Sequence, residues 1–169
     1  MRQGIALLAA AILAACGGDE PPEPWDRAEE GVRAAVFRYE LMLPGTGGEV
    51  SRPTYCFLGV SEPAGSGGGT PFAGRDPAPA VLDRFAGHAF PVLGVSAAVR
   101  GADGRPVDRK TGRPGVLLLT GDIRWRRRYD AEIDVLRLAA AGDPSGRTYR
   151  VVWRHGRWTV VDVAAEGMP

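Results

Sequence analysis

The stretch "RTYRVVWRHGRWTVVDVA", residues 147–164, decides the fold that the sequence predicts. On each side of His155-Gly156 the residues alternate or run apolar over the length of a β-strand, and the pair between them is typical of a tight turn. The segment "AEIDVLRLAA", 131–140, has the same character and is joined to this hairpin by the turn-like "AGDPSG", 141–146. These segments together predict an antiparallel meander.

Strand-like segments continue upstream of the meander. They are "VLLLTGDIRW" at 116–125, "AFPVLGVSAAV" at 89–99 and a short strand at 54–60, and the turn-rich "RGADGRPVDRKTGRPG" precedes the first of them. The Gly- and Pro-rich stretch 61–79 is longer than an ordinary connection and lacks the G-K-[ST] of a phosphate-binding loop. We therefore expect a flexible surface loop there.

An amphipathic helix is predicted over Asp26 to Leu43. "DRAE" places an N-cap aspartate three residues ahead of Glu29, and Pro44-Gly45 marks the end of the helix. Apolar residues recur between these limits at helical spacing, namely Ala28, Val32, Ala35, Val36, Tyr39 and Leu43. Phe37 and Leu41 lie off this stripe, which predicts a helix that packs on a concave surface through more than one face.

A second, short helix is predicted after the loop. Asp76 and Pro77 have the residue types of an N-cap and a first helical residue, and Gly87 closes the segment that carries Val81, Leu82 and Phe85. The expected fold class is α+β: an N-terminal amphipathic helix plus a short second helix packed on a curved antiparallel sheet, a cone-like roll.

This order of elements resembles the NTF2-like (cystatin-like, cone-shaped) superfamily. Helix 26–43 takes the place of its long first helix, and "RTYRVVWRHGRWTVVDV", with Trp153 and Trp158 on either side of the turn, takes the place of its final hairpin. The chain is also similar to uncharacterised bacterial proteins that share "YCFLGV" and the pair "GVLL" then "IRW". The resemblance implies the fold but no single activity, since the superfamily includes isomerases, dehydratases, binding proteins, secretion-system parts and immunity proteins.

The N-terminus has the pattern of an export signal. Met1-Arg2 supplies a positive start, and the apolar segment 5–15 is too short to span a bilayer as a helix. Leu13-Ala14-Ala15-Cys16 resembles the lipobox of bacterial lipoproteins, which implies cleavage before Cys16 and acylation of its thiol. Gly17 in place of aspartate implies sorting to an outer membrane facing the periplasm, if the host has one. The alternative is an ordinary secretory signal with a chance cysteine.

These patterns divide the chain into three parts: a signal peptide at 1–15, a lipidated Cys16 with a flexible tether at 16–25, and a single α+β domain at 26–169. The tether "GGDEPPEPW" combines Gly, Pro and acid with almost no apolar content. Arg2 leaves with the signal, so the other Lys and Arg balance the 20 Asp and Glu. That balance gives no basic excess for binding nucleic acid.

Candidate catalytic groups do not converge in the sequence. His88 follows the helix stop at Gly87, where it is a weak candidate for a general base or a cap on the last carbonyls. His155 lies in a predicted turn, and Ser96 lacks the second glycine of a nucleophile elbow. Cys56 is expected to be a small buried hydrophobe, with a partner thiol or a reactive role as the alternative.

Metal and cofactor sites are not expected. The two histidines and one free cysteine are scattered, and Asp103 and Asp108 in "DGRPVD" lack the spacing of a calcium loop, so we interpret both aspartates as turn residues.

Two further groups have alternative interpretations. Asp130, Glu132 and Asp134 alternate along one strand beside the arginines of "RWRRRY", Arg124, Arg126, Arg127 and Arg128. Cross-strand Arg-carboxylate pairs explain both runs, and a surface for a partner or anionic ligand is the alternative. The aromatic residues either line a pocket inside the cone or fill it; they are Tyr39, Tyr55, Trp125, Tyr149, Trp153 and Trp158.

We therefore expect a membrane-anchored envelope lipoprotein whose domain is a non-catalytic binding or structural module without a cofactor. Its partners would be the membrane, through the anchor, and an envelope protein. An NTF2-like enzyme or a carrier of small apolar ligands that uses the cone cavity is one alternative. An immunity or inhibitor protein that binds through the charged strand is another.

Overall fold

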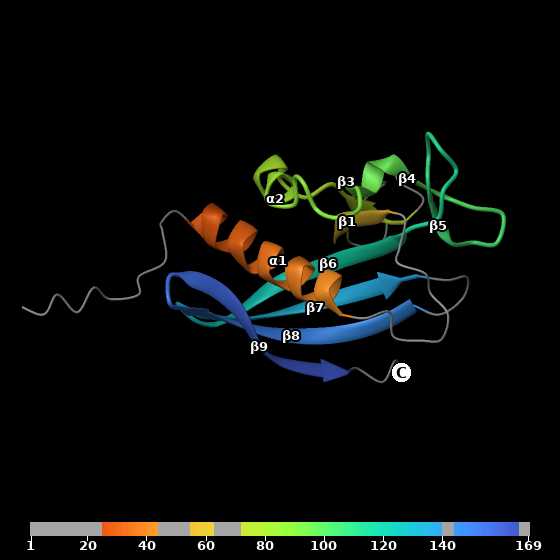
Figure 1. Ribbon diagram of the computed structural model, residues 1–169. Helices are drawn as coiled ribbons and strands as arrows, with labels where there is room; N and C mark the ends of the chain where they lie inside the picture. The colour runs from red at the N-terminus through yellow and green to blue at the C-terminus, as the bar shows by residue number, and fades with distance from the viewer. Residues whose placement is uncertain (1–24, 44–54, 63–71, 140–143, 166–169) are drawn as a thin grey trace, which may run out of the picture.

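The computed structural model describes residues 25–43, 55–62, 72–139 and 144–165. Figure 1 shows one long helix lying across a curved open sheet, with a smaller layer of short elements at one side. The helices are α1 (Trp25–Met42), α2 (Pro79–Asp83) and the 3-10 turn η1 (Val95–Ala97). The strands are β1 (Cys56–Ser61), β2 (Gly74–Arg75), β3 (Val92–Gly94), β4 (Ala98–Arg100), β5 (Pro106–Asp108), β6 (Val116–Arg127), β7 (Asp130–Leu138), β8 (Pro144–Arg154) and β9 (Arg157–Ala165).

The main sheet has the order β2-β1-β6-β7-β8-β9, and β3 also pairs with β1. Strands β6 to β9 form an antiparallel meander, as the sequence predicts. The prediction of a wholly antiparallel sheet is wrong, because β1 runs parallel to both β6 and β3. Long connections allow parallel pairing, and the chain between β1 and β6 contains α2, β3 and the β4–β5 hairpin.

The parallel part of the sheet is buried on both faces. Cys56, Leu58 and Leu118 pack toward α1 and α2, whereas Phe57 and Leu117 pack on the opposite side with Val95 and Ala98. A strand buried on both faces needs apolar residues at every position. This explains the continuous runs "CFLGV" and "VLLL" in the sequence.

The meander is buried on one face only. Along β7, Ala131, Ile133 and Val135 are buried, while Asp130, Glu132 and Asp134 between them are partly exposed. We call the side under α1 the helix face and the other side the outer face. Successive side chains of a strand point to opposite faces, so the alternation in the sequence follows from this one-sided burial.

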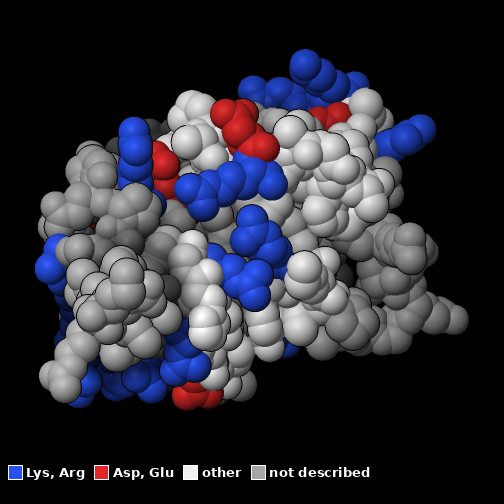
Figure 2. Space-filling view, turned by 60° about the vertical axis from the view of Figure 1, so that its left-hand side comes forward, with Lys and Arg blue, Asp and Glu red and all other residues white. Residues whose placement is uncertain are grey.

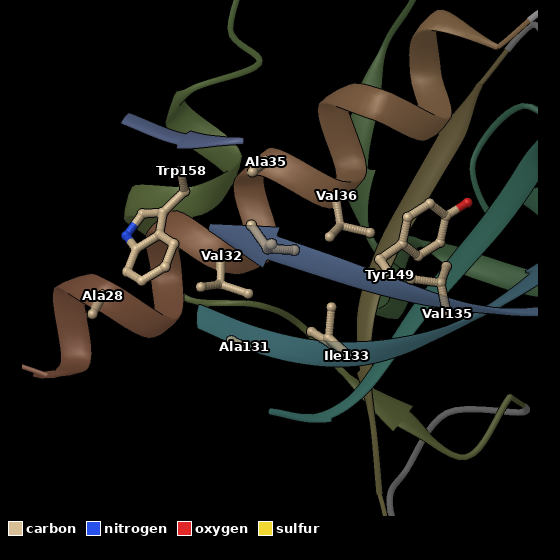
Figure 3. Packing of buried hydrophobic residues seen from close by; sticks show 10 residues of the cluster. Ala28, Val32, Ala35, Val36, Ala131, Ile133, Val135, Tyr149 and Trp158 are labelled. Atoms are coloured by element: carbon tan, nitrogen blue, oxygen red, sulfur yellow. The ribbon is translucent and has the colours of Figure 1, made fainter. Parts of the chain in front are cut away.

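Helix α1 matches its predicted range to within one residue at each end. Ala28, Val32, Ala35 and Val36 pack on β7, β8 and β9 (Figure 3). Phe37, off the predicted stripe, is fully buried on a second side of the helix, against β1, β6 and α2. The prediction that α1 packs through more than one face is confirmed.

The predicted start of the second helix is wrong. Helix α2 begins at Pro79 with Ala78 as its N-cap, and no side chain caps it. Ala78 is extended at φ −53° and ψ 142°, because the residue before a proline avoids the helical region. Asp76 instead accepts hydrogen bonds from the backbone N–H and the Oγ of Ser96, at 2.8 and 2.7 Å. Gly87 ends the segment at φ +82°, as expected.

The predicted strand at 89–99 is broken into β3, η1 and β4. Ser96 lies in the 3-10 turn, held by Asp76, and β4 then leaves the main sheet to pair with β5. Strand β5 lies inside the segment that we interpreted as turns alone. The predicted signal and lipidation site, the stop at Pro44-Gly45 and residues 63–71 of the predicted Gly-rich loop lie outside the described residues. The prediction of a flexible loop is wrong for the end of that segment, because Phe72 is buried in a core cluster and Gly74–Arg75 form β2, which pairs with β1.

Candidate functional site

Glu40, near the C-terminal end of α1, points its carboxylate toward the sheet, where it is buried. The Glu40 residue is 2% exposed, and its Oε2 accepts a hydrogen bond from Arg137 Nη1 at 3.0 Å. Its Oε1 accepts a hydrogen bond from the hydroxyl of Tyr149 and lies 3.6 Å from Arg147 Nη1. The three partners all project from the helix face: Arg137 continues the β7 series of Ala131, Ile133 and Val135, and Arg147 and Tyr149 alternate along β8.

In this Glu40 cluster, the negative charge of Glu40 is more than balanced by the arginines around it. Two guanidinium groups face one carboxylate, and their side chains are only 13% and 22% exposed at Arg137 and Arg147. Burial and the hydrogen bond to Glu40 raise the pKa of Tyr149 above its ordinary value of 10.0, so its hydroxyl stays a donor. A hydrogen bond with Tyr149 is the main cause that raises the pKa of Arg147. The arrangement fixes α1 to the sheet and leaves Glu40 with three donors around it.

Sequence reasoning missed this cluster. Glu40 follows Val32 and Val36 at intervals of four, so it lies on the apolar stripe of the predicted helix. A charged residue on such a stripe, four positions after a buried valine, was the available signal for a buried ion pair.

A second buried charged residue of α1, Arg33, binds only groups of the sheet among the described residues. Arg33 Nη1 donates to Thr120 Oγ1 and to the carbonyl oxygen of Gly121, both at 2.8 Å. Thr120 in turn donates to the carbonyl oxygen of Gly59 at 3.2 Å. These bonds lie where the β6–β7 register shifts after Thr120, so Arg33 satisfies polar atoms at an irregularity of the sheet. Burial lowers the pKa of Arg33.

The predicted base and nucleophile candidates, His88, Ser96 and Cys56, do not contact one another, and each has other partners. His88 is exposed, its ring packs edge-on against Phe90 at 4.4 Å between centroids, and its backbone N–H donates to the carbonyl oxygen of Phe85. The hydroxyl of Ser96 is bound to Asp76. Cys56 is fully buried, and burial raises the pKa of its thiol to about 12, so the thiol stays protonated.

Of the remaining polar candidates, His155 and Asp103 lie in turns, as the sequence indicates, whereas Asp108 is the last residue of β5 and is buried. His155 occupies the β8–β9 turn at φ +51°. Asp108 accepts hydrogen bonds from the N–H and Oγ1 of Thr111, and the side-chain bond is the main cause that lowers its pKa. Asp103 accepts a hydrogen bond from the backbone N–H of Arg105. Among the described residues, no group of three or more His, Cys, Asp or Glu is placed to hold a metal ion.

The outer face of the meander carries the predicted cross-strand pairs. Arg124 forms a two-point ion pair with Asp134, Arg126 lies 3.3 Å from Glu132, and Thr148 Oγ1 donates to Asp134 at 2.7 Å. We call these pairs, together with the next one, the charged ladder. Arg150 binds Asp130 through two bonds of 3.0 and 2.7 Å. Hydrogen bonds from Arg150 and Arg124 lower the pKa of Asp130 and of Asp134, respectively.

The charged ladder ends in a region rich in arginine. The β6–β7 and β8–β9 turns lie at the same end of the meander, because each strand reverses its predecessor. We call this region the arginine end; it comprises Arg126, Arg127, Arg128, Arg150, Arg154 and Arg157. A shallow hollow of about 270 Å³ opens there between Arg126, Arg127, Asp130 and Arg150.

Four of the six aromatic residues pack in the cluster on the helix face, namely Trp125, Tyr149, Trp153 and Trp158, whereas Tyr55 packs on the opposite side of the sheet and Tyr39 is exposed. The Trp158 ring meets Trp125 and Trp153 edge-on, at 5.7 and 5.6 Å between centroids. Its indole lies so close to α1 that a Cβ at Gly31 would be 2.4 Å from Cδ1 (Figure 3 shows Trp158 beside Ala28). Glycine at position 31 therefore allows the helix to approach the β8–β9 hairpin.

Comparison of the chain with models of protein families, with curated proteins and with solved structures found no match. In the described part of the chain, no helix has the length and apolar character needed to cross a membrane.

Proposed function

We propose that this protein is a lipid-anchored lipoprotein of the bacterial cell envelope, and that its α+β domain is a non-catalytic binding or structural module. The anchor rests on the lipobox-like Leu13-Ala14-Ala15-Cys16 and on the acidic, Pro-rich tether after it. Acylation of the Cys16 thiol and of the new amino group would give the two chains that stable anchoring needs. Gly17 favours an outer membrane, facing the periplasm, in a host that has one.

One observation carries the non-catalytic part of the proposal. In the cone-like roll of the NTF2-like superfamily, which we propose for this chain, the space between the helix and the sheet is where a ligand would enter. Here Val32, Val36, Ile133, Tyr149 and Trp158 pack into one another in that space and are at most 7% exposed. Glu40, the buried carboxylate beside this cluster, is held by Arg137, Arg147 and Tyr149.

The anchor is tested by intact mass and membrane fractionation of the full-length chain expressed in a bacterium. We expect the wild-type protein in the membrane pellet with the mass of residues 16–169 plus acyl groups. Cys16→Ala should abolish acylation and anchoring, whereas Cys56→Ala, the matched change at the other cysteine, should retain both. A soluble wild-type product cut near Ala15, or a Cys16→Ala protein that stays in the pellet after a salt wash, would refute the anchor.

The carrier alternative is tested with a dye that fluoresces in apolar cavities. Because the helix face is filled, we expect the native acylated protein in mild detergent to raise the dye's fluorescence no more than detergent alone. Mild acid or denaturant, which loosens packing, should expose apolar surface and raise the fluorescence. Saturable binding of one dye by the native protein would instead favour a carrier.

A further inference from the structure

Positive charge is concentrated at the arginine end in excess of the acids that face it. Asp130 and Glu132 are engaged by Arg150 and Arg126, and Asp162 of β9 lies opposite Arg150. Arg127, Arg154 and Arg157 are exposed and form no ion pair within the described residues. Figure 2, which turns this end of the molecule forward, shows more surface from Lys and Arg than from Asp and Glu.

The hollow at this end has the form of a shallow anion site. Three arginines and one already paired aspartate line it, which leaves an excess of guanidinium donors around the opening. Guanidinium groups bind phosphate oxygens through two parallel hydrogen bonds. Glu29 and Glu30 belong to α1, on the helix face, and form no ion pair with these arginines in the part of the chain that the structure describes.

Helix α1 begins at the same end. Gly31 and Ala28, in its first half, pack beside Trp158, which follows Arg157 in β9. Residues 17–24 separate Cys16 from the start of α1 at Trp25, and a chain of that length spans roughly 30 Å at most and roughly 15 to 18 Å as a coil. The β4–β5 hairpin lies at the opposite side of the molecule from the start of α1 (Figure 1). An anchor at Cys16 would therefore hold the arginine end near the bilayer and the β4–β5 hairpin away from it.

We propose that the arginine end docks on the anionic phospholipid headgroups of the membrane that holds Cys16, with a headgroup phosphate in the hollow between Arg126, Arg127 and Arg150. This inference rests on the proposed lipid anchor. The lipid chains supply attachment, and the arginines fix which side of the domain faces the bilayer. Each arginine close to an anionic surface strengthens binding by roughly fivefold.

The test places the purified acylated protein in vesicles and measures arginine modification by phenylglyoxal with mass spectrometry. Vesicles of phosphatidylcholine alone are compared with vesicles that also contain phosphatidylglycerol. We expect phosphatidylglycerol to slow modification of Arg127, Arg154 and Arg157 by roughly fivefold or more. Salt at roughly 1 M, where the screening length falls to about 3 Å, should restore the rate. Inorganic phosphate added to phosphatidylcholine vesicles should not protect these residues.

A matched pair of variants locates the effect. In the triple variant Arg127→Gln/Arg154→Gln/Arg157→Gln, phosphatidylglycerol should no longer protect Arg126 and Arg150 from phenylglyoxal. Arg109→Gln/Lys110→Gln/Arg113→Gln, the same charge change beside the exposed β5 turn, should preserve it. Equal modification in both vesicles by a protein whose intact mass shows acyl groups would overturn the docking and leave the anchor standing. An intact mass without acyl groups would overturn the anchor and, with it, this inference.

Discussion

The two halves of the sheet are built by different rules. Strand β1 and the first half of β6 are buried on both faces, between the α1–α2 side and the η1–β4 side. Strands β7 to β9 are buried on the helix face, and their outer face carries the charged ladder. In the sequence, the strands of the first half are unbroken apolar runs, whereas those of the second half alternate apolar and polar residues. The number of covered faces, rather than strand length, determines which pattern a strand shows.

The largest expected effect is in the doubly buried half. Phe57→Ala should cost about 4 kcal/mol and Leu118→Ala about 3 kcal/mol of unfolding free energy, although the two side chains point to opposite faces. Both residues are at most 1% exposed, so each truncation leaves a cavity. Urea denaturation measures these values. If either change cost less than 1 kcal/mol, the face concerned would not be a true core, and the comparison would fail.

Glu40→Ala should come next, at about 3 kcal/mol, because it leaves Arg137 and Arg147 partly buried without their carboxylate. Glu29→Ala, a matched change at an exposed position of the same helix, should stay within about 0.5 kcal/mol. Thermal or urea unfolding of both variants decides the point. Equal costs would mean that the Glu40 cluster does not hold α1 to the sheet.

The charged ladder should contribute far less. Arg124 and Asp134 keep 49% and 40% of their side chains exposed, so a double-mutant cycle of Arg124→Ala and Asp134→Ala should give a coupling below about 1 kcal/mol. The coupling should shrink further in high salt, since the pair is exposed to screening. A coupling as large as the cost of Leu118→Ala would show that the outer face is covered in solution.

The smallest expected effect is the fall in the free energy of unfolding at low pH that comes from Asp130 and Asp134. The pKa values of Asp130 and Asp134 are lowered from 3.8 by their arginine partners, so their contribution is complete above that value and is lost as the pH falls through the lowered pKa. Urea midpoints should thus be insensitive to these groups between about pH 7 and 5 and fall below about pH 4. Asp130→Asn/Asp134→Asn should flatten the acid limb. An unchanged acid limb would mean that the ladder does not favour the folded state.

The meander and α1 were predictable because their signals are local. The alternation of Asp130 to Val135 lies within β7 and the apolar stripe lies within α1, and the turn at His155-Gly156 joins two strands that are adjacent in the sequence. The parallel pairing of β1 with β6 was not predictable, because an apolar run such as "CFLGV" shows that a strand is buried but not which strand lies beside it. The start of α2 was missed because Asp76 serves Ser96, a contact between distant parts of the chain.

The candidate sites divide in the same way. The cross-strand pairs of the ladder follow from neighbouring strands and their alternating charges, so the sequence predicts them. The Glu40 cluster joins α1 to β7 and β8, and only the packed structure brings Arg137 and Tyr149 to one carboxylate. The arginine end was predictable only in part. The arginines of "RWRRRY" are adjacent in the sequence, whereas Arg154 and Arg157 lie near them because of the register of the meander.

The packing of α1 on Trp158 also sets the order in which the chain can fold. The helix is synthesised before any strand, yet its apolar stripe is buried only against β7, β8 and β9, the last strands made. The hairpins of the meander involve local contacts and form fast, whereas β1 must find β6 across a long intervening segment. The residues of α1 are therefore among the last to gain their native contacts, although they are made before every strand. A chain that lacks β9 has no complete surface for this face of α1, so the packing around Trp158 forms only once the last strand is present.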